Sequence, residues 1–206
     1  QAWDIIEQVG DRLWQGIIRL WQASNQYESD HPEGARRRAE EALRLCQEVG
    51  NHNFEIESWG LLGLIALDWG EALKARSHFR RAVEVAEVGR YTGDRSYHLS
   101  HLALAQLRLG HADEADRLSS EALSTLDALG TFDRTKDVCF ERYQIVAKTK
   151  GADVARPYLE RAYQLLWEQA AQIGDPELRE SFLSEIRINR AILLAHRLDR
   201  PPSPVL

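Results

Sequence analysis

Asp94, His98 and His101 form the sequence pattern closest to a metal site. On a helix, these spacings would place all three side chains on one face, where they could share a metal ion. Such triples also arise freely on polar helix faces, and Asp94 is well placed as the N-cap of a helix that begins after it. We therefore interpret the histidines as surface or interhelix residues, and we expect no metal and no cofactor.

The other reactive residues fall into no catalytic pattern. The sequence has no G-x4-G-K-[ST] phosphate loop, no G-x-S-x-G elbow, no H-E-x-x-H pair and no C-x-x-C pair. Cys46 and Cys139 occupy core positions of different repeats, which indicates neither a redox sensor nor a disulfide and fits a reducing compartment. We expect that the protein is not an enzyme.

Composition narrows the range of partners. The 206 residues are 44% hydrophobic and 28% charged, with a formal net charge of -6, which argues against direct nucleic-acid contact. The basic triplet Arg36 to Arg38 is followed by Glu40 and Glu41, so we expect a salt-bridged helix face. No apolar run is long enough to span a bilayer and no signal-peptide pattern is present, so we expect no membrane contact and a cytoplasmic location.

Small residues recur along the chain with a period of about forty residues. Each repeat has the register Ala, a variable residue four positions later, and Ala three positions after that. The members are Ala35, Ala39 and Ala42; Ala75, Phe79 and Ala82; Ala115, Ser119 and Ala122; and Ala155, Leu159 and Ala162. A constant period of this size is typical of stacked helical hairpins, each of which depends on its neighbours to bury its apolar face.

Glycines mark the expected helix ends, because glycine accepts the left-handed conformation that closes a helix. The markers between units are Gly10, Gly50, Gly89, Gly130 and Gly174, and those within units are Gly70, Gly110 and Gly151. They predict helices at roughly 12–28, 33–49, 52–69, 72–88, 95–109, 112–129, 134–149, 152–173 and 176–197, with no β-sheet.

Close helix crossings require small side chains. We expect Gly63 to face Ala75 across one hairpin, with the bulky Trp59 and Phe79 filling the wedge on either side. The geometry would repeat in the next unit.

These residues resemble a tetratricopeptide repeat. The strongest unit has Trp59, Leu62, Gly63, Ala66, Ala75, Phe79 and Ala82 at the spacing of that family. Weaker units follow in register with Leu99, Leu102, Ala103, Ala115, Ser119 and Ala122, and then with Tyr143, Ala155, Leu159 and Ala162, while the first unit keeps mainly Ala23, Ala35, Ala39 and Ala42. The resemblance covers about residues 12–173 and implies an all-α, right-handed superhelical solenoid of antiparallel hairpins.

The period exceeds the usual 34 residues of that family. Longer units with Leu-Gly or Val-Gly before Asn or Asp look similar to the C-terminal sensor arrays of large bacterial signal-transduction ATPases, the MalT-like and AfsR-like regulators. They also resemble peptide-sensing quorum regulators and longer-repeat scaffolds.

The domain organisation follows from the repeats. Residues 1–10 align with the end of a repeat helix, so we expect a fragment of a larger protein, and 11–174 form about four hairpins. Residues 175–198 predict a capping helix with Asp175 as N-cap and Pro176 at its first position. Its covering face is predicted to comprise Leu178, Phe182, Ile186 and Leu193. A Pro-rich tail occupies 199–206.

The resemblance implies a concave groove lined by the first helix of each hairpin. The residues expected there are Glu57, Gly60, Leu64, Asp68, Tyr97, Ser100, Leu104, Arg108, Phe140 and Gln144. Their mixture of aromatic, apolar and charged groups suits an amphipathic helix or an extended peptide. Alternatively, Leu64, Leu67, Leu104 and Leu107 belong to a thick core.

The resemblance implies a non-catalytic scaffold that binds a protein or peptide, or other domains of its parent chain, as the sensor region of a bacterial signalling or transcription regulator. One alternative is self-association as a homo-oligomer through Trp3, Trp14 or Trp21. Another is a regulatory domain that senses a small molecule or peptide in the groove.

Overall fold

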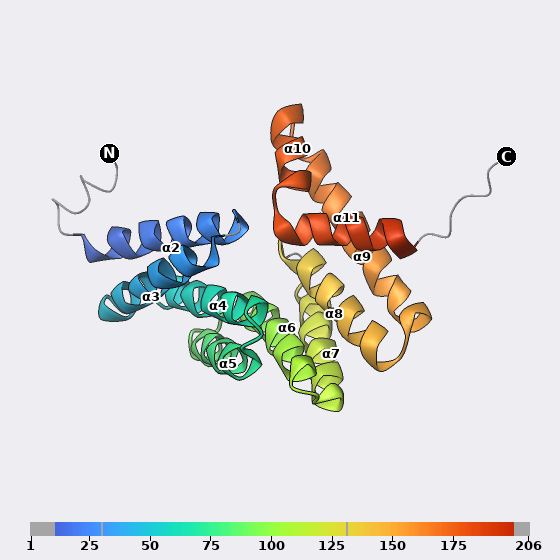
Figure 1. Ribbon diagram of the computed structural model, residues 1–206, viewed down its shortest axis with the longest axis horizontal. Coiled ribbons are helices and arrows are strands. Elements are labelled where there is room, and N and C mark those ends of the chain that lie inside the picture. The colour runs from blue at the N-terminus through green and yellow to red at the C-terminus, as the bar shows by residue number, and fades with distance from the viewer. Residues whose placement is uncertain (1–10, 30, 131, 200–206) are drawn as a thin grey trace.

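The computed structural model describes residues 11–29, 31–130 and 132–199, and within these ranges the chain forms ten helices and no strand (Figure 1). Four hairpins pair α2 (Arg12–Glu28) with α3 (Pro32–Glu48), α4 (His52–Asp68) with α5 (Ala72–Val88), α6 (Thr92–Arg108) with α7 (Ala112–Leu129), and α8 (Thr135–Thr149) with α9 (Ala152–Ala171). The predicted all-α solenoid is confirmed. The expected helix end at 1–10 and all but Asp199 of the predicted tail lie outside the described residues.

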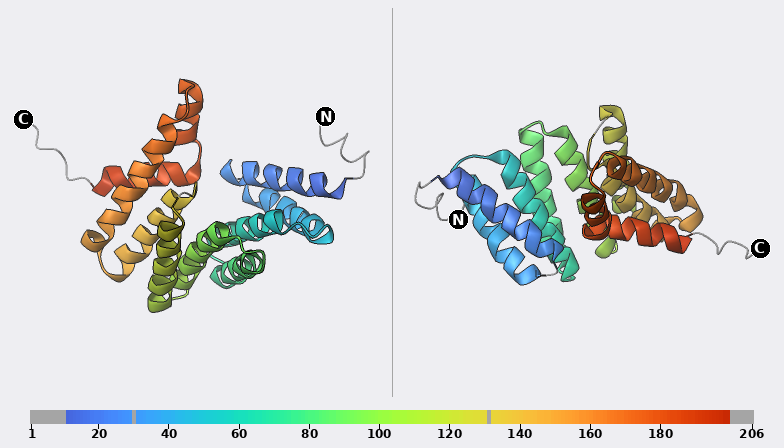
Figure 2. Two further views of the ribbon diagram at one scale, coloured as in Figure 1. Left: turned by 180° about the vertical axis from the view of Figure 1, so that it is seen from behind. Right: turned by 90° about the horizontal axis from the view of Figure 1, so that it is seen from above.

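Successive hairpins stack into a curved array (Figure 2). The first helices of the hairpins, α2, α4, α6 and α8, face the concave side, and α3, α5 and α7 lie outside them. Two further helices, α10 (Pro176–Ser184) and α11 (Arg187–Asp199), fold back beside α9. The C-terminal helices therefore approach the open side of the array, opposite α2.

The small-residue register lies at the centre of the packing. All of its positions in the second helices are fully buried: Ala35, Ala39, Ala42, Ala75, Phe79, Ala82, Ala115, Ser119, Ala122, Ala155, Leu159 and Ala162. Ser119 fits because its hydroxyl donates to the Ala115 carbonyl at 2.8 Å and accepts from Arg142 Nη1 at 2.8 Å. The repeat period thus corresponds to equivalent core positions.

Gly63 lets α4 pack closely on α5. A Cβ placed on Gly63 would overlap the ring of Phe79, which is fully buried. The sequence placed Ala75 opposite this glycine, whereas the nearest atoms belong to Phe79. Trp59 is half-buried and stacks on His78, with ring centroids 5.5 Å apart. The glycine therefore accommodates the largest core side chain of the repeat.

Most helix ends follow the predicted glycine pattern. Left-handed φ values occur at Gly50, Gly70, Gly110, Gly130 and Gly151. Gly89 marks a helix end as predicted, as the C-cap of α5, but Arg90 and not Gly89 takes the left-handed conformation there, with a φ of 58°. Gly89 keeps a φ of -78° and its small size serves another purpose, since a Cβ on it would overlap the Tyr91 ring. Gly174 has no left-handed φ either.

Helix α6 begins earlier than predicted. Its first residue is Thr92 and its N-cap is Tyr91, so Asp94 lies in the first helical turn and is not the N-cap. A carboxylate there interacts favourably with the helix dipole. Burial nevertheless raises the pKa of Asp94 above its usual value.

The predicted capping helix over 176–197 is two helices. Its start is as expected, with the Asp175 carboxylate accepting from the Glu177 and Leu178 backbone N–H groups at 2.8 and 3.4 Å. The chain then turns after Ser184. Arg190 Nη1 donates to the Ser184 and Glu185 carbonyls, and Asn189 Nδ2 donates to the Phe182 carbonyl at 2.8 Å. These side chains satisfy carbonyl groups that a continuous helix would have paired internally.

The break changes which side chains are covered. Leu178, predicted to face the core, is 62% exposed, whereas Phe182 and Leu193 are partly buried against the core. On α11, Ile192 is fully buried, as is the polar Asn189. The turn therefore redirects the apolar face of the C-terminal segment.

The basic triplet lies in a network of paired charges. Arg36 Nε pairs with Glu40 at 2.9 Å, and Arg38 Nη1 donates to Gln26 Oε1 at 2.7 Å. Glu41 pairs with Arg19 on α2 at 3.0 Å, and so joins two helices. No helix in the described part of the chain is long and apolar enough to cross a membrane.

Replacing Gly63 by Ala should destabilise the fold by about 1–3 kcal/mol, because the new methyl group displaces the Phe79 ring. The loss from this overlap should exceed the ~1 kcal/mol by which alanine favours the helical conformation over glycine. Gly34→Ala is the matched control, since the nearest atoms there belong to the flexible end of Gln26. Urea unfolding of both variants measures the difference. Equal stabilities would contradict the close crossing.

Candidate ligand-binding cavity

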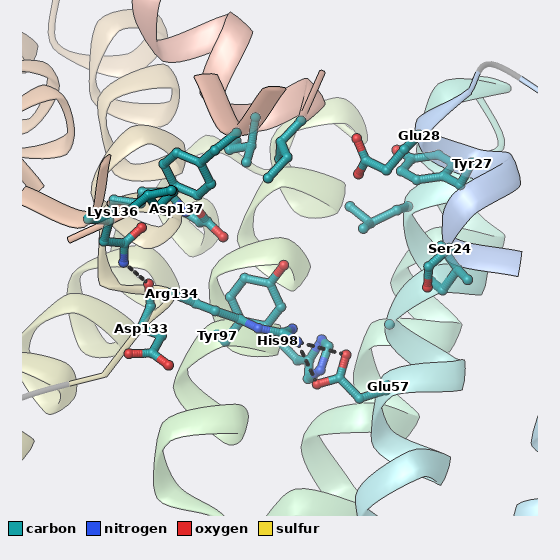
Figure 3. A pocket seen from close by; sticks show the side chains of 18 of the residues that line it. Ser24, Tyr27, Glu28, Glu57, Tyr97, His98, Asp133, Arg134, Lys136 and Asp137 are labelled. Carbon is teal, nitrogen blue, oxygen red and sulfur yellow. Dashed lines mark hydrogen bonds and ion pairs between the residues drawn. The ribbon is translucent and has the colours of Figure 1, made fainter. Parts of the chain in front are cut away.

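A cavity of about 690 Å³ lies on the concave side of the array (Figure 3). Its lining combines the C-terminal end of α2, the middle of α4, the start of α6, the segment entering α8, and the C-terminal helices. In the close view, Tyr27 and Glu28 on α2 stand across the cavity from Lys136 and Asp137 on α8. Residues far apart in the sequence therefore line one open cavity.

A partly buried ion pair crosses the floor of the cavity. Arg134 Nη2 lies 2.9 Å and 3.0 Å from the two carboxylate oxygens of Glu57. The guanidinium also lies over the Tyr97 ring, 4.5 Å from its centroid. Burial opposes the charged form of Arg134, but Tyr97 and Glu57 raise its pKa above the usual value. The group therefore remains a fixed cation between α4 and α6.

A second charge pair lies at the start of α8. Lys136 Nζ donates to Asp137 Oδ1 at 2.8 Å, and both side chains are almost fully buried. Burial raises the pKa of Asp137, and Lys136 opposes that shift. The backbone carbonyl of Asp133, beside this pair, accepts from Gln169 Nε2 at 2.6 Å. The polar wall is therefore held by hydrogen bonds to α9.

Another part of the lining is apolar. It is formed by Leu61, Leu64, Ile173, Phe182, Ile186 and Ile188. Three of these come from the C-terminal helices or the turn between them. A ligand would therefore meet both charged, hydrogen-bonding groups and aliphatic surface, as is common in binding pockets.

Arg187 joins the two ends of the array at the rim of the cavity. Its backbone N–H donates to Glu28 Oε2 at 2.9 Å, and its Nη1 lies 2.7 Å from Asp68 Oδ2. The guanidinium also lies 4.4 Å from the centroid of the Tyr27 ring. We call this group of four residues the clasp. It connects α11 with the C-terminal ends of α2 and α4.

A buried polar network lies behind the cavity, between α6 and α8. The Ser100 hydroxyl donates to Glu141, and His101 Nε2 lies 3.0 Å from the other Glu141 oxygen. His101 Nδ1 is 3.1 Å from the Tyr97 carbonyl, so this nitrogen carries the proton and Nε2 accepts from a protonated Glu141. Burial raises the pKa of Glu141 well above its usual value and lowers that of His101 to about 3.

The network is not a nucleophilic triad. In such a triad the serine hydroxyl bonds the histidine, whereas Ser100 bonds the carboxyl group. All three side chains are buried. Within the described ranges, no group of three or more His, Cys, Asp or Glu residues is arranged to hold a metal ion. Burial also raises the pKa values of the Cys46 and Cys139 thiols to about 11, which disfavours the reactive thiolate.

The structure brings together some of the residues expected in the groove. Those lining the cavity are Glu57, Gly60, Leu64 and Tyr97. Asp68 lies at its rim in the clasp. The other expected residues do not line the cavity. Ser100 and Phe140 are buried away from it, and Leu104 packs partly buried against the core. Gln144 is half-buried, and Arg108 is exposed at the end of α6. Leu64, Leu67, Leu104 and Leu107 all pack against the core, and Leu64 also lines the cavity.

Several lining residues escaped the sequence reasoning. They are Ser24, Tyr27 and Glu28 on α2, Arg134, Lys136 and Asp137 around the start of α8, and the aliphatic residues of the C-terminal segment. The repeat register could have identified the α2 residues, because they belong to a first helix. Nothing in the register of the hairpins describes where α10 and α11 fold back.

The chain was compared with known proteins. No family model matches it, and no curated protein matches it. Its fold is similar to that of a Rap protein complexed with competence and sporulation factor, with a TM-score of 0.71 and 17% identity over 94% of this chain and 56% of that one. The apo form of RapI gives 0.68, with 13% identity over 94% of this chain and 70% of that one.

A third similar structure is aspartyl phosphate phosphatase F from Bacillus subtilis, with a TM-score of 0.65 and 16% identity over 90% of this chain and 49% of that one. The chain thus spans about half the length of this phosphatase and of the complexed Rap protein. At these identities the likeness concerns the fold, a TPR-like helical repeat.

Replacing Arg187 by Ala should open the rim of the cavity, because it removes the ion pair with Asp68 and the contact with the Tyr27 ring. The clasp is partly exposed, so its loss should cost only about 1 kcal/mol of stability. Spin labels on exposed Asn25→Cys and Glu177→Cys can report the distance between α2 and α10, while Cys46 and Cys139 stay buried. We expect a longer and broader distance distribution in the Arg187→Ala background. Arg197→Ala, which removes an exposed charge from the same helix, is the control. Identical distributions in both backgrounds would rule out the clasp.

Replacing Glu141 by Gln should keep the unfolding free energy within about 1 kcal/mol, because an amide reproduces the hydrogen bonds of a protonated carboxyl group. Glu141→Ala should cost about 2–4 kcal/mol by leaving Ser100 and His101 unpaired. Chemical denaturation at pH 6 measures both. A loss in Glu141→Gln as large as that in Glu141→Ala would indicate an ionised Glu141.

The pair also predicts a pH dependence. In the folded state, Glu141 and His101 together hold one proton. In the unfolded state they hold two protons below pH 4.5, one between the ordinary pKa values of 4.5 and 6.5, and none above pH 6.5. The contribution of this pair to the free energy of unfolding should therefore fall above pH 6.5, by up to about 1.4 kcal/mol per pH unit. The fall should end once the pH exceeds the raised pKa of Glu141. Glu141→Gln lacks this loss, so it should gain stability relative to the wild type between pH 6.5 and 8. Parallel pH profiles would contradict the assignment.

Proposed function

We propose that the chain is a non-catalytic repeat scaffold that holds a short peptide, or a peptide segment of a partner protein, in the cavity. The observation that carries this proposal is a cavity of about 690 Å³ between both ends of the array, whose lining combines charged and aliphatic side chains. A peptide presents both kinds of group, and volumes of this size suit compact ligands. The fold neighbour complexed with competence and sporulation factor lends support.

Within this proposal, the contact residues are Glu57, Gly60, Leu64 and Tyr97 from the expected groove, joined by Arg134 and the apolar wall. We further propose that the chain is the sensor region of a larger cytoplasmic bacterial regulator, resembling the MalT-like and AfsR-like arrays. Ligand occupancy would then be transmitted to other domains by a small change in curvature, since an array with contacts only between neighbours is compliant along its length.

Selection of a phage-displayed library of random short peptides against the chain tests peptide binding directly. Leu64→Trp fills the cavity, so each enriched and resynthesised peptide should bind this variant at least about tenfold more weakly. Leu73→Trp is the control, because Leu73 is 62% exposed on α5, outside the concave side. Fluorescence anisotropy measures the affinities, and circular dichroism checks folding. Unchanged binding to Leu64→Trp would exclude the cavity as the site.

Self-association is a second candidate function. Trp14 and Trp21 are 48% and 56% exposed on α2, and exposed tryptophans are enriched at protein interfaces. The expected third residue of this group, Trp3, lies outside the described residues. Light scattering over a range of concentrations separates the two functions, since a concentration-independent monomer would exclude assembly through this helix.

A further inference from the structure

His98 is a buried polar side chain without a hydrogen-bond partner. It lies on α6 in the lining of the cavity and is 1% exposed. Neither ring nitrogen has a hydrogen-bond partner among the described residues. Leaving such a group unpaired is unfavourable, and native proteins rarely do so without a functional reason.

The neighbouring histidine shows the usual arrangement. His101, one turn later on α6, is equally buried, and both of its ring nitrogens lie within hydrogen-bonding distance of oxygen atoms. His98 instead packs among rings and backbone. Its ring lies 5.0 Å from the Tyr97 ring and against Gly60, where any Cβ would overlap it. Packing alone holds the ring, and no hydrogen bond from the described residues fixes its two nitrogens.

The state of His98 limits the ligand chemistry. Burial lowers its pKa well below 6.5, with smaller contributions from His101 and Arg134, so the imidazole is neutral and offers one donor and one acceptor. An uncharged amide offers the complementary acceptor and donor.

The cations that line the cavity are already paired. Glu57 and Arg134 already bind each other, as do Lys136 and Asp137. The carboxylates of Glu28 and Asp133 add negative charge to the lining, without a further cation in it. The cations of the lining are therefore already committed to Glu57 and Asp137, and the neutral His98 ring is matched by an uncharged hydrogen-bonding group.

We propose that His98 is a ligand-binding residue whose ring hydrogen-bonds an uncharged amide of the peptide held in the cavity. This inference rests on the proposed function. The amide belongs either to the peptide backbone or to an Asn or Gln side chain, because the two share the same donor and acceptor.

Two variants on adjacent turns of α6 test whether His98 is retained for stability. His98→Leu removes an unpaired polar group and should leave the thermal unfolding midpoint unchanged or raise it. His101→Leu makes the same chemical change but leaves Glu141 without its partner, so it should lower the midpoint. If His98→Leu is destabilised as strongly as His101→Leu, the ring has a structural role and the proposal is overturned.

Binding is tested with the peptides enriched from the library. They should bind His98→Leu about tenfold more weakly than the wild type, which corresponds to the loss of one hydrogen bond. Replacing each Asn or Gln of a peptide by Leu, and separately methylating each backbone nitrogen, identifies the source of the amide. Equal affinity of every peptide for wild type and His98→Leu would overturn the proposal.

A spectroscopic measurement keeps the two proposals distinct. The wild-type chain with ¹⁵N-labelled histidine is titrated with N-methylacetamide, acetate and methylammonium. The His98 ring nitrogens should shift with the amide and not with the ions, even if the library enriches no peptide and the proposed function fails. No shift with N-methylacetamide or with any enriched peptide would overturn the role of His98 alone.

Discussion

The close crossing of neighbouring helices is the constraint on which the rest of the structure depends. Each hairpin buries its apolar face only by packing on the next one, and the backbones can approach only where side chains are small. The fully buried alanines of the second helices, and Gly63 beneath the Phe79 ring, provide that space. Because the same spacing returns in every repeat, the stacking accumulates as curvature, and one face of the array becomes concave.

The concave face concentrates polar groups that the core could not accept. Ion pairs there connect elements that are distant in sequence, such as Glu57 on α4 with Arg134 before α8. The Arg187 clasp adds a contact between the last helix and the first described one. These charged groups are paired or hydrogen-bonded, which makes their partial burial tolerable. His98 departs from this rule in the same cavity, and so the strongest sign of ligand binding is an absent hydrogen bond.

Sequence reasoning succeeded where local pattern and packing agree. The alanine register predicted the buried positions, and most left-handed helix ends coincide with glycines. It failed where a side-chain contact a few residues away along the chain overrode the expected pattern. Gly89 is small because the Tyr91 ring packs on it, which leaves Arg90 to take the left-handed conformation. The helix expected over 176–197 breaks because Asn189 and Arg190 satisfy the carbonyls at the end of α10.

By itself, the sequence determined the class of fold, the hairpin period and the small residues at helix crossings, because these depend on spacing within a few helical turns. Only the tertiary structure decided which side chains share the cavity, since Tyr27, Arg134 and Ile188 meet through the summed curvature of four hairpins. The fold-back of α10 and α11 and the isolation of the His98 nitrogens likewise depend on contacts between distant segments. No periodic pattern within one segment encodes such contacts.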